Sequence, residues 1–277
     1  MRIVETITVA IVWSGLWAAM AGSVYAQACS NDGSGFGAWM GQYRAKAAAD
    51  GISQRTLSAA LDGVTYDAGV VQLDRNQKSF KLTFEQFYAR RVSSSLIARG
   101  QQRMAQNKAL LDRIEARFGV PREVIVSIWG LETNYGADGN GGRSIIRSLA
   151  TMAHDCRRAP FFTNELNNAL RIVDRGDVAL GEMRGGWAGE IGPMQFLPSS
   201  YVKYAVDFDS DGRRDLFRSV PDMLASTANF LKSYGWKAGQ PWGAGTANFE
   251  VLRNWNKADV YVRAISLMSE RMAGKGR

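Results

Sequence analysis

The stretch at residues 124–132, Val-Ile-Val-Ser-Ile-Trp-Gly-Leu-Glu, decides the fold. Pro121 stands just before it and suits the start of a helix, because the first turn leaves its N–H groups unpaired in any case. Apolar residues then recur at three-to-four spacing, the pattern of a helix with one face in the core; they are Val124, Ile125, Ile128 and Leu131. The sequence therefore predicts a buried helix over residues 122–132, ended by the Asn-Tyr-Gly turn at 134–136.

Glu132 lies on or beside the apolar face of this helix, four residues after Ile128 and seven after Ile125. A carboxylate in that place loses water, which raises its pKa. Such a group can donate a proton near neutral pH, as a general acid does. The ordinary alternative is a helix-terminal glutamate that reaches solvent or pairs with an arginine, and the spacing alone favours that alternative.

Helical periodicity recurs along the rest of the chain, whereas strand signals are sparse. Ser53 suits the cap of one further helix, because its hydroxyl can accept a free backbone N–H. The main periodic segments are Phe36–Ala49, Phe80–Ile97, Asn107–Phe118, Ser148–His154, Asn164–Val173 and Val220–Tyr234. The predicted fold class is mainly α.

Composition limits the kind of partner. The chain of 277 residues has a formal net charge of +8, which indicates an anionic partner such as nucleic acid, acidic lipid or bacterial cell wall. No nucleic-acid-binding module is recognised, so nucleic acid is not the expected partner. Eight Trp, nine Tyr and twelve Phe fit a groove for sugars, although most aromatic residues simply form the core.

The N-terminus has the pattern of a secretory signal peptide. An apolar run at residues 7–21 is followed by Ala26-Gln27-Ala28, which has the small-x-small form of a cleavage site. We therefore predict a signal peptide over residues 1–28 and export of the remaining chain. An uncleaved membrane anchor is the alternative, because the run nearly reaches the length that spans a membrane.

Only two cysteines are present, Cys29 and Cys156. In an exported protein an even number favours one disulfide, here joining the mature N-terminus to the body of the domain. Two free thiols are the alternative. A metal site built from cysteine is not expected, because His154 is the only imidazole in the chain and is interpreted as structural.

The surroundings of Glu132 reverse the balance between its two interpretations. Residues 129–136, Trp-Gly-Leu-Glu-Thr-Asn-Tyr-Gly, resemble the glutamate-containing motif of the lytic murein transglycosylase B family, a branch of the lysozyme-like superfamily. Further blocks follow in that family's order: 148–153 with the pair at 157–158, 186–201, 205–208 and 229–236. The resemblance runs from about Phe36 to Trp242, with a last piece at 252–268.

The resemblance implies a lysozyme-like α domain with an additional N-terminal helical region. We place that region at residues 29–120 and the catalytic core at 121–245. Residues 246–277 are expected to form a C-terminal helix that packs back on the core. The segment between Trp242 and Asn248 is shorter than in typical members, which indicates a trimmed peripheral insertion.

The resemblance also implies an activity on peptidoglycan glycan strands. Family members cleave the β-1,4 bond between N-acetylmuramic acid and N-acetylglucosamine without water, and the C6 hydroxyl of the muramic residue closes a 1,6-anhydro ring. Glu132 is then the general acid and afterwards the base, so one carboxyl suffices and no catalytic cofactor is expected. Glu190 is interpreted as a surface residue. We expect a periplasmic monomer that acts peripherally on the cell wall.

Substrate-binding residues carry over from the family by position. They are Tyr135, Gly186, Trp187, Gln195, Phe230, Asn256 and Tyr261. Three positions depart from the family: glycine replaces the usual serine at Gly186, phenylalanine replaces tyrosine at Phe230, and Trp255 also replaces a tyrosine. The first two departures each remove a hydroxyl. For Tyr261, packing within a helix is an equally good interpretation.

An acidic loop begins at Asp207 and has the form of a partial EF-hand. Acids at positions one, three, five and nine with glycine at six suit a hard cation surrounded by oxygen ligands. Arg218 stands at position twelve, where a glutamate is expected, and the resemblance implies that a later acid closes the site. The predicted ligands of a structural calcium ion are Asp207, Asp209, Asp211, Arg213 and Asp222, with weaker affinity than a complete loop would give.

Two other functions remain open. One is a non-catalytic or weakly active peptidoglycan-binding protein with the same fold, which Gly186, Phe230 and the trimmed insertion favour and Glu132 opposes. The other is a hydrolysing muramidase, whose product would contain the water that an anhydro product lacks.

Overall fold

The computed structural model describes residues 29–76, 82–139 and 141–275. The predicted signal peptide, residues 1–28, lies outside the described residues, so it stays a prediction. Within the described ranges no helix is both long enough and apolar enough to cross a membrane.

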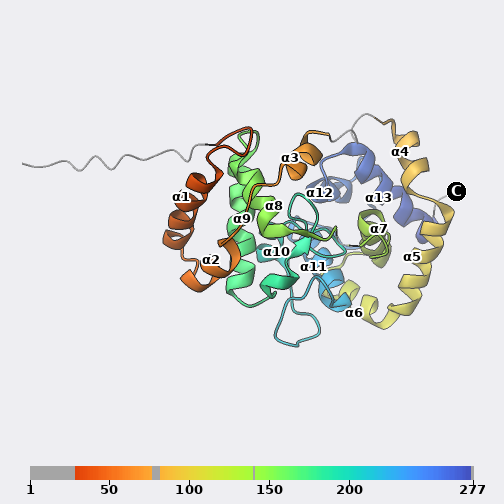
Figure 1. The fold of residues 1–277 in the computed structure, drawn as a ribbon. Coiled ribbons are helices and arrows are strands. Elements are labelled where there is room, and N and C mark those ends of the chain that lie inside the picture. The colour runs from red at the N-terminus through yellow and green to blue at the C-terminus, as the bar shows by residue number, and fades with distance from the viewer. Residues whose placement is uncertain (1–28, 77–81, 140, 276–277) are drawn as a thin grey trace, which may run out of the picture.

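Helices dominate the described chain (Figure 1). They are α1 (Phe36–Ala49), α2 (Gln54–Leu61), α3 (Ala68–Arg75), α4 (Phe84–Arg91), α5 (Ser94–Gln106), α6 (Lys108–Phe118), α7 (Arg122–Thr133), α8 (Ile145–His154), α9 (Ala159–Asp174), η2 (Leu180–Glu182), α10 (Pro198–Tyr204), α11 (Val220–Ser233), α12 (Ala247–Trp255) and α13 (Asp259–Met272). Two short strands, β1 (Arg143–Ser144) and β2 (Arg184–Gly185), pair antiparallel. The mainly α prediction is confirmed.

Local sequence signals explain where several helices begin and end. The hydroxyl of Ser53 accepts the N–H of Thr56 and caps α2, as the sequence predicts. Gly119 ends α6 in a left-handed conformation with φ of 72°, which glycine adopts without strain. One prediction is wrong: residues 80–97 do not form one helix. The chain breaks between α4 and α5, because Ser93 caps a new helix by accepting the N–H of Leu96.

The core is organised around α7, which packs against α5, α6, α11 and α13. Its predicted apolar face is fully buried, with no exposure at Val124, Ile125 and Ile128. The C-terminal helix α13 packs on α7, α4 and α5. Helices α1 and α2 lie at the other end of the molecule, where they contact α8 and α9 (Figure 1). The last turn of α7 therefore lies well inside the structure.

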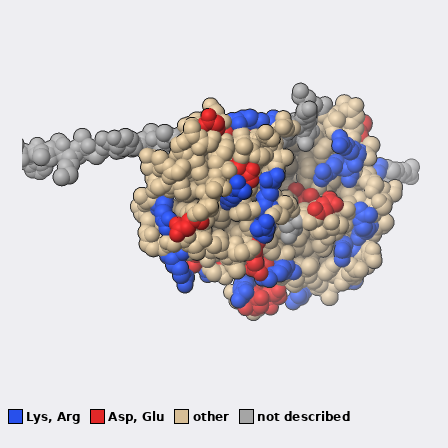
Figure 2. Space-filling model, in the orientation of Figure 1, with Lys and Arg blue, Asp and Glu red and all other residues tan. Residues whose placement is uncertain are grey.

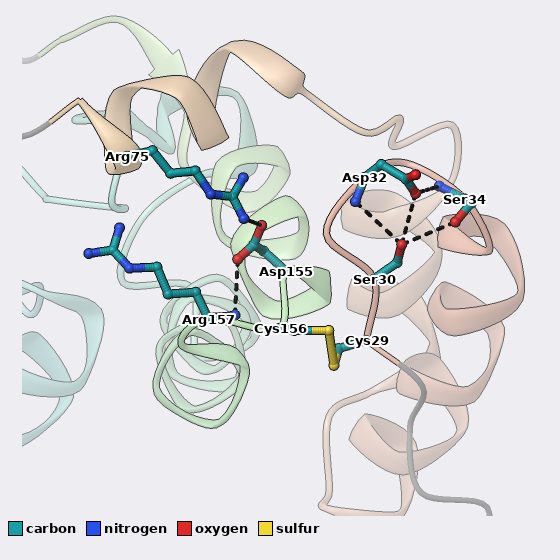
Figure 3. The surroundings of a disulfide bond; sticks show 8 residues. All are labelled: Cys29, Ser30, Asp32, Ser34, Arg75, Asp155, Cys156 and Arg157. Carbon is teal, nitrogen blue, oxygen red and sulfur yellow. Dashed lines mark hydrogen bonds and ion pairs between the residues drawn. A yellow bond between two sulfur atoms is a disulfide. The ribbon is translucent and has the colours of Figure 1, made fainter.

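The predicted disulfide between Cys29 and Cys156 is present, with the two Cα atoms 5.0 Å apart (Figure 3). It joins the segment before α1 to the connection between α8 and α9. Next to it the Ser30 N–H donates to the His154 carbonyl oxygen at 3.0 Å. The buried carboxylate of Asp155 accepts a hydrogen bond from the Arg75 guanidinium at 2.7 Å. These contacts fix the segment before α1 and the end of α3 onto the end of α8.

Two further polar residues are buried in this half of the molecule. Asp74, only 1% exposed, forms ion pairs with the guanidinium groups of Arg157 and Arg158. The imidazole of His154 is fully buried between aromatic rings, with ring centroids 5.4 Å from Phe36 and 5.6 Å from Trp39. The structural interpretation of His154 fits this environment.

Candidate active site

A cavity of about 290 Å³ opens at the carboxyl end of α7. Its walls come from the end of α7, the loop between β2 and α10, and helices α10 to α12. The lining residues are Glu132, Glu190, Gln195, Phe196, Leu197, Ser200, Phe230, Asn254, Trp255 and Asn256. Four residues that the sequence singled out therefore meet in one place: Glu132, Gln195, Phe230 and Asn256.

Glu132 stands in the last turn of α7, half-buried against the cavity. Its Oε1 accepts a hydrogen bond from the indole Nε1 of Trp255 at 2.9 Å. Burial raises the pKa of Glu132 above its ordinary value of 4.5, while contacts with Trp255 and Tyr261 act in the opposite direction. The charge of Arg91 also lowers this pKa, and the charge of Glu190 raises it. Desolvation is the largest influence, as the position on the apolar face predicted.

The turn after Glu132 holds the helix end against the opposite wall. Asn134 and Tyr135 both have positive φ, 51° and 61°, so the chain reverses sharply. The Thr133 hydroxyl donates to the Pro193 carbonyl oxygen at 2.6 Å and accepts the Gly136 N–H at 3.1 Å. This side chain therefore links the helix that carries the acid to the glycine-rich loop.

The glycine-rich loop between β2 and α10 closes on itself through paired backbone bonds. Ile191 and Phe196 exchange hydrogen bonds of 2.7 and 3.0 Å. Backbone approaches are closest at two glycines: a Cβ at Gly185 would lie 1.9 Å from the Glu190 carbonyl oxygen, and one at Gly192 would lie 2.0 Å from that of Leu216. No other residue fits at either position. The glycines therefore give the loop its tight path.

Glu190 belongs to the cavity, so its interpretation as a surface residue is wrong. Its Oε2 accepts the Ala188 N–H at 2.9 Å. Burial raises the pKa of Glu190 above its ordinary value of 4.5. The carboxyl folds back over Gly186, where an added Cβ would lie 2.1 Å from Oε2. The sequence signal that could have revealed this contact is the pairing of a glycine at 186 with an acid four residues later.

Trp255 is the residue of the candidate site that sequence reasoning missed most clearly. Its indole N–H is the donor to Glu132, and its ring also forms part of the cavity wall. The ring stands perpendicular to those of Phe196 and Phe230, with centroid distances of 5.2 and 5.1 Å. These edge-to-face contacts fix the direction of the indole. The only signal in the sequence was the replacement of the family's tyrosine.

Four predicted substrate contacts do not line the cavity: Tyr135, Gly186, Trp187 and Tyr261. The Tyr135 hydroxyl donates to the Leu96 carbonyl oxygen at 3.0 Å and the side chain is only 5% exposed, so the left-handed turn directs it into the core. Gly186 lies under the Glu190 carboxyl, and Trp187 is half-buried beside it.

Tyr261 has a different position, behind Glu132 on α13. Burial, and next the charge of Glu132, raise the pKa of Tyr261 well above its ordinary value of 10.0. Its side chain is not part of the cavity lining, and its buried hydroxyl has no hydrogen-bond partner among the described residues.

The acidic loop lies between α10 and α11, where acidic side chains gather at the bottom of the view in Figure 2. Carboxylate oxygens of Asp207, Asp209 and Asp211 lie within 4.8 Å of one another. Asp222 lies outside this cluster: it is fully buried and accepts the N–H groups of Phe208 and Asp215 at 2.7 and 2.8 Å. The backbone N–H of Arg213 donates to Asp211 at 2.8 Å. Three of the five predicted ligands are thus brought together.

Comparison with known proteins identifies relatives of this chain. Residues 35–246 match the family model described as transglycosylase SLT domain. Membrane-bound lytic murein transglycosylase B of Escherichia coli (strain K12) is 41% identical over 136 residues, which cover 48% of this chain and 37% of that protein. The matched region thus spans well under half the length of that relative.

Two solved structures show the same architecture. SltB3 from Pseudomonas aeruginosa, in complex with NAG-anhNAM-pentapeptide, has a TM-score of 0.82 at 33% identity and covers 87% of this chain and 80% of that one. Slt35 of Escherichia coli, in complex with calcium, has a TM-score of 0.76 at 24% identity, covering 85% and 93%. The lysozyme-like fold is thereby confirmed. Since the family model matches most of the chain and the fold agrees, this chain belongs to the transglycosylase SLT domain family.

Proposed function

We propose that the protein is a lytic transglycosylase that cleaves the β-1,4 bond between N-acetylmuramic acid and N-acetylglucosamine in peptidoglycan. The observation that carries the proposal is one desolvated carboxyl group, Glu132, oriented by an indole N–H at 2.9 Å in a cavity. The similar SltB3 structure holds a fragment with an anhydro muramic residue. The excess of basic side chains, spread over the face shown in Figure 2, suits an anionic wall polymer.

The mechanism follows from the two oxygens of Glu132. Oε1 accepts the Trp255 N–H, and no hydrogen bond to Oε2 is found in the part of the chain that the structure describes. The protonated acid donates its proton to the glycosidic oxygen as the bond to the muramic anomeric carbon breaks. The C6 hydroxyl of that sugar then bonds to the anomeric carbon and returns its proton to Glu132. Trp255 stabilises the carboxylate that exists between the two steps.

Two amide side chains are placed to hold the sugar. The Gln195 Nε2 donates to the Gly192 carbonyl oxygen at 2.9 Å, which leaves its carbonyl oxygen for a substrate donor. The Asn256 carbonyl oxygen accepts the Ala258 N–H at 2.9 Å, which leaves its amide protons for a substrate acceptor. Opposite hydrogen-bonding capacity on the two walls suits the hydroxyl and N-acetyl groups of the glycan.

The test is the substitution Glu132→Gln, assayed by release of anhydro-muropeptides from purified sacculi and detected by mass spectrometry. Removal of a general acid is expected to lower the rate by about 10²- to 10⁴-fold. Glu250→Gln, at an exposed position on α12, is the matched control and should keep wild-type activity. Products heavier by one water would support the hydrolysing muramidase instead. A wild-type protein that binds sacculi and releases nothing would support the non-catalytic alternative.

We also propose that the acidic loop binds a structural calcium ion through Asp207, Asp209 and Asp211. The donors are all oxygens, and Gly212 at position six has φ of 86°, as the sharp turn of such a loop requires. Arg213 would contribute through its backbone carbonyl at position seven. Asp222 lies outside the cluster, and both of its carboxylate oxygens already accept backbone N–H groups. Calcium should raise the melting temperature of the wild type by a few degrees and leave that of an Asp207→Asn, Asp209→Asn variant unchanged. An equal response of both proteins would reject the site.

The expected location is the periplasm, with the protein acting as a monomer at the wall. The relative from Escherichia coli is named membrane-bound. Sequencing the N-terminus of the protein recovered from fractionated cells distinguishes a chain that begins after Ala28 from an uncleaved anchor, and size-exclusion chromatography tests the monomer.

A further inference from the structure

Glu190 is the second acid of the cavity that contains Glu132. It comes from the glycine-rich loop, on a different wall from the end of α7. Its side chain is held in one direction, because Oε2 accepts the Ala188 N–H at 2.9 Å. For the other oxygen, Oε1, no hydrogen-bond partner is found across residues 29–76, 82–139 and 141–275. One carboxylate oxygen thus anchors the side chain, and the second is left for a donor in the cavity.

Gly186 provides the space that this arrangement needs. A Cβ built there would lie 2.1 Å from Oε2 and 2.8 Å from Cδ of Glu190, far inside contact distance. The backbone of Gly186 does not have the positive φ that excludes other residues, so the restriction is one of space. The Glu190 carboxyl therefore occupies the space that a side chain at position 186 would need.

We propose that Glu190 is a second functional carboxyl group of the cavity, which accepts a hydrogen bond from a hydroxyl or amide N–H of the bound sugar. The inference rests on the proposed function and adds a substrate contact to it. Glu132 remains the proton donor, and Glu190 orients the sugar that receives the proton.

A double-mutant cycle tests whether side chains at positions 186 and 190 compete for the same space. Glu190→Ala removes the carboxyl, and Gly186→Ser displaces it, so each single variant should lose about tenfold to a hundredfold in kcat/KM. In the combined Gly186→Ser, Glu190→Ala variant the serine hydroxyl fits the vacated space, and activity should exceed that of both single variants. Losses that simply multiply would overturn the proposal. Circular dichroism and melting temperature confirm that each variant is folded.

A binding measurement separates this inference from the proposed function. In a Glu132→Gln background, the affinity for a NAG–NAM tetrasaccharide is measured by calorimetry with and without Glu190→Gln. Glu190→Gln keeps an oxygen for the Ala188 N–H but loses the charge, and should weaken binding by about tenfold. Equal affinities would overturn the role of Glu190 even if the wild type is active. Weakened binding together with an inactive wild type would support Glu190 and reject the transglycosylase.

The pH profile gives a readout that a purely structural loop residue would not change. The groups facing Glu132 are Trp255 of α12, Tyr261 of α13, Arg91 of α4 and Glu190 of the loop. The charge of Glu190 raises the pKa of Glu132, so Glu190→Gln should move the alkaline limb of kcat/KM to lower pH. Glu250→Gln is the charge-matched control and should leave the limb in place. An unmoved limb in Glu190→Gln would count against a carboxylate that faces the acid.

Discussion

Asp74 of α3 and Glu132 of α7 are both acids withdrawn from water, but their partners differ. Asp74 is 1% exposed and receives two guanidinium groups, with Arg157 at 2.7 Å. Glu132 has no ion pair with any described residue and receives only an indole N–H at 2.9 Å. A carboxylate that two guanidinium groups hold joins two parts of the chain. Desolvation raises the pKa of a carboxyl that has no ion pair, which favours its proton-donating form.

The comparison predicts, first, that Asp74→Asn destabilises the fold. The substitution leaves two arginines without their shared acceptor, and the free energy of unfolding should fall by about 2 kcal/mol, the range for hydrogen bonds to charged groups. Urea denaturation measures it. Asp62→Asn is the control, because the pair of Asp62 with Arg44 is exposed at the surface and should contribute under about 1 kcal/mol. Equal losses in the two variants would contradict the structural role of Asp74.

The variant Trp255→Phe tests how far the single hydrogen bond to Glu132 determines its behaviour. The variant keeps most of the ring but loses the only hydrogen bond found to Glu132, so kcat/KM should fall by roughly tenfold, or about 1.4 kcal/mol. Because contact with Trp255 lowers the pKa of Glu132, its loss should move the alkaline limb of activity to higher pH.

The matched control for this substitution is Trp236→Phe. The indole nitrogen of Trp236 is buried without a partner among the residues the structure describes, so its removal should leave the pH profile unchanged. An unchanged pH profile in Trp255→Phe would show that the indole N–H does not affect the pKa of Glu132.

The smallest effect concerns the stability of Glu132→Gln. Burial raises the pKa of Glu132, so the folded state prefers its neutral form, and the stability that this preference gives is lost as pH rises through the raised pKa. Glutamine has no charge to desolvate. At neutral pH the variant should therefore be more stable than the wild type by roughly 0.5–2 kcal/mol, the range of single stabilising substitutions. Urea denaturation at several pH values measures the difference, which should vanish below pH 4.5; a less stable variant at neutral pH would contradict it.

Features that depend on local sequence were predictable. The apolar spacing placed Glu132 correctly on the buried helix α7, and the even number of cysteines gave the disulfide. Contacts between distant segments were not: Trp255 and Glu132 are 123 residues apart, and periodicity carries no information on such a pair. Tyr135 was predicted to contact the substrate but is buried, because its direction depends on a left-handed backbone turn, which neighbouring side chains do not specify.

The close backbone approaches at Gly185 and Gly192 limit how this protein could be redesigned. A randomised library of the loop should return glycine alone at these two positions, whatever substrate is selected for, because any side chain would collide with a carbonyl oxygen. Gly186 differs, since the obstacle there is the movable carboxyl of Glu190. Diversity at 186 is therefore available only in combination with a smaller residue at 190, so the two positions have to be varied as a pair.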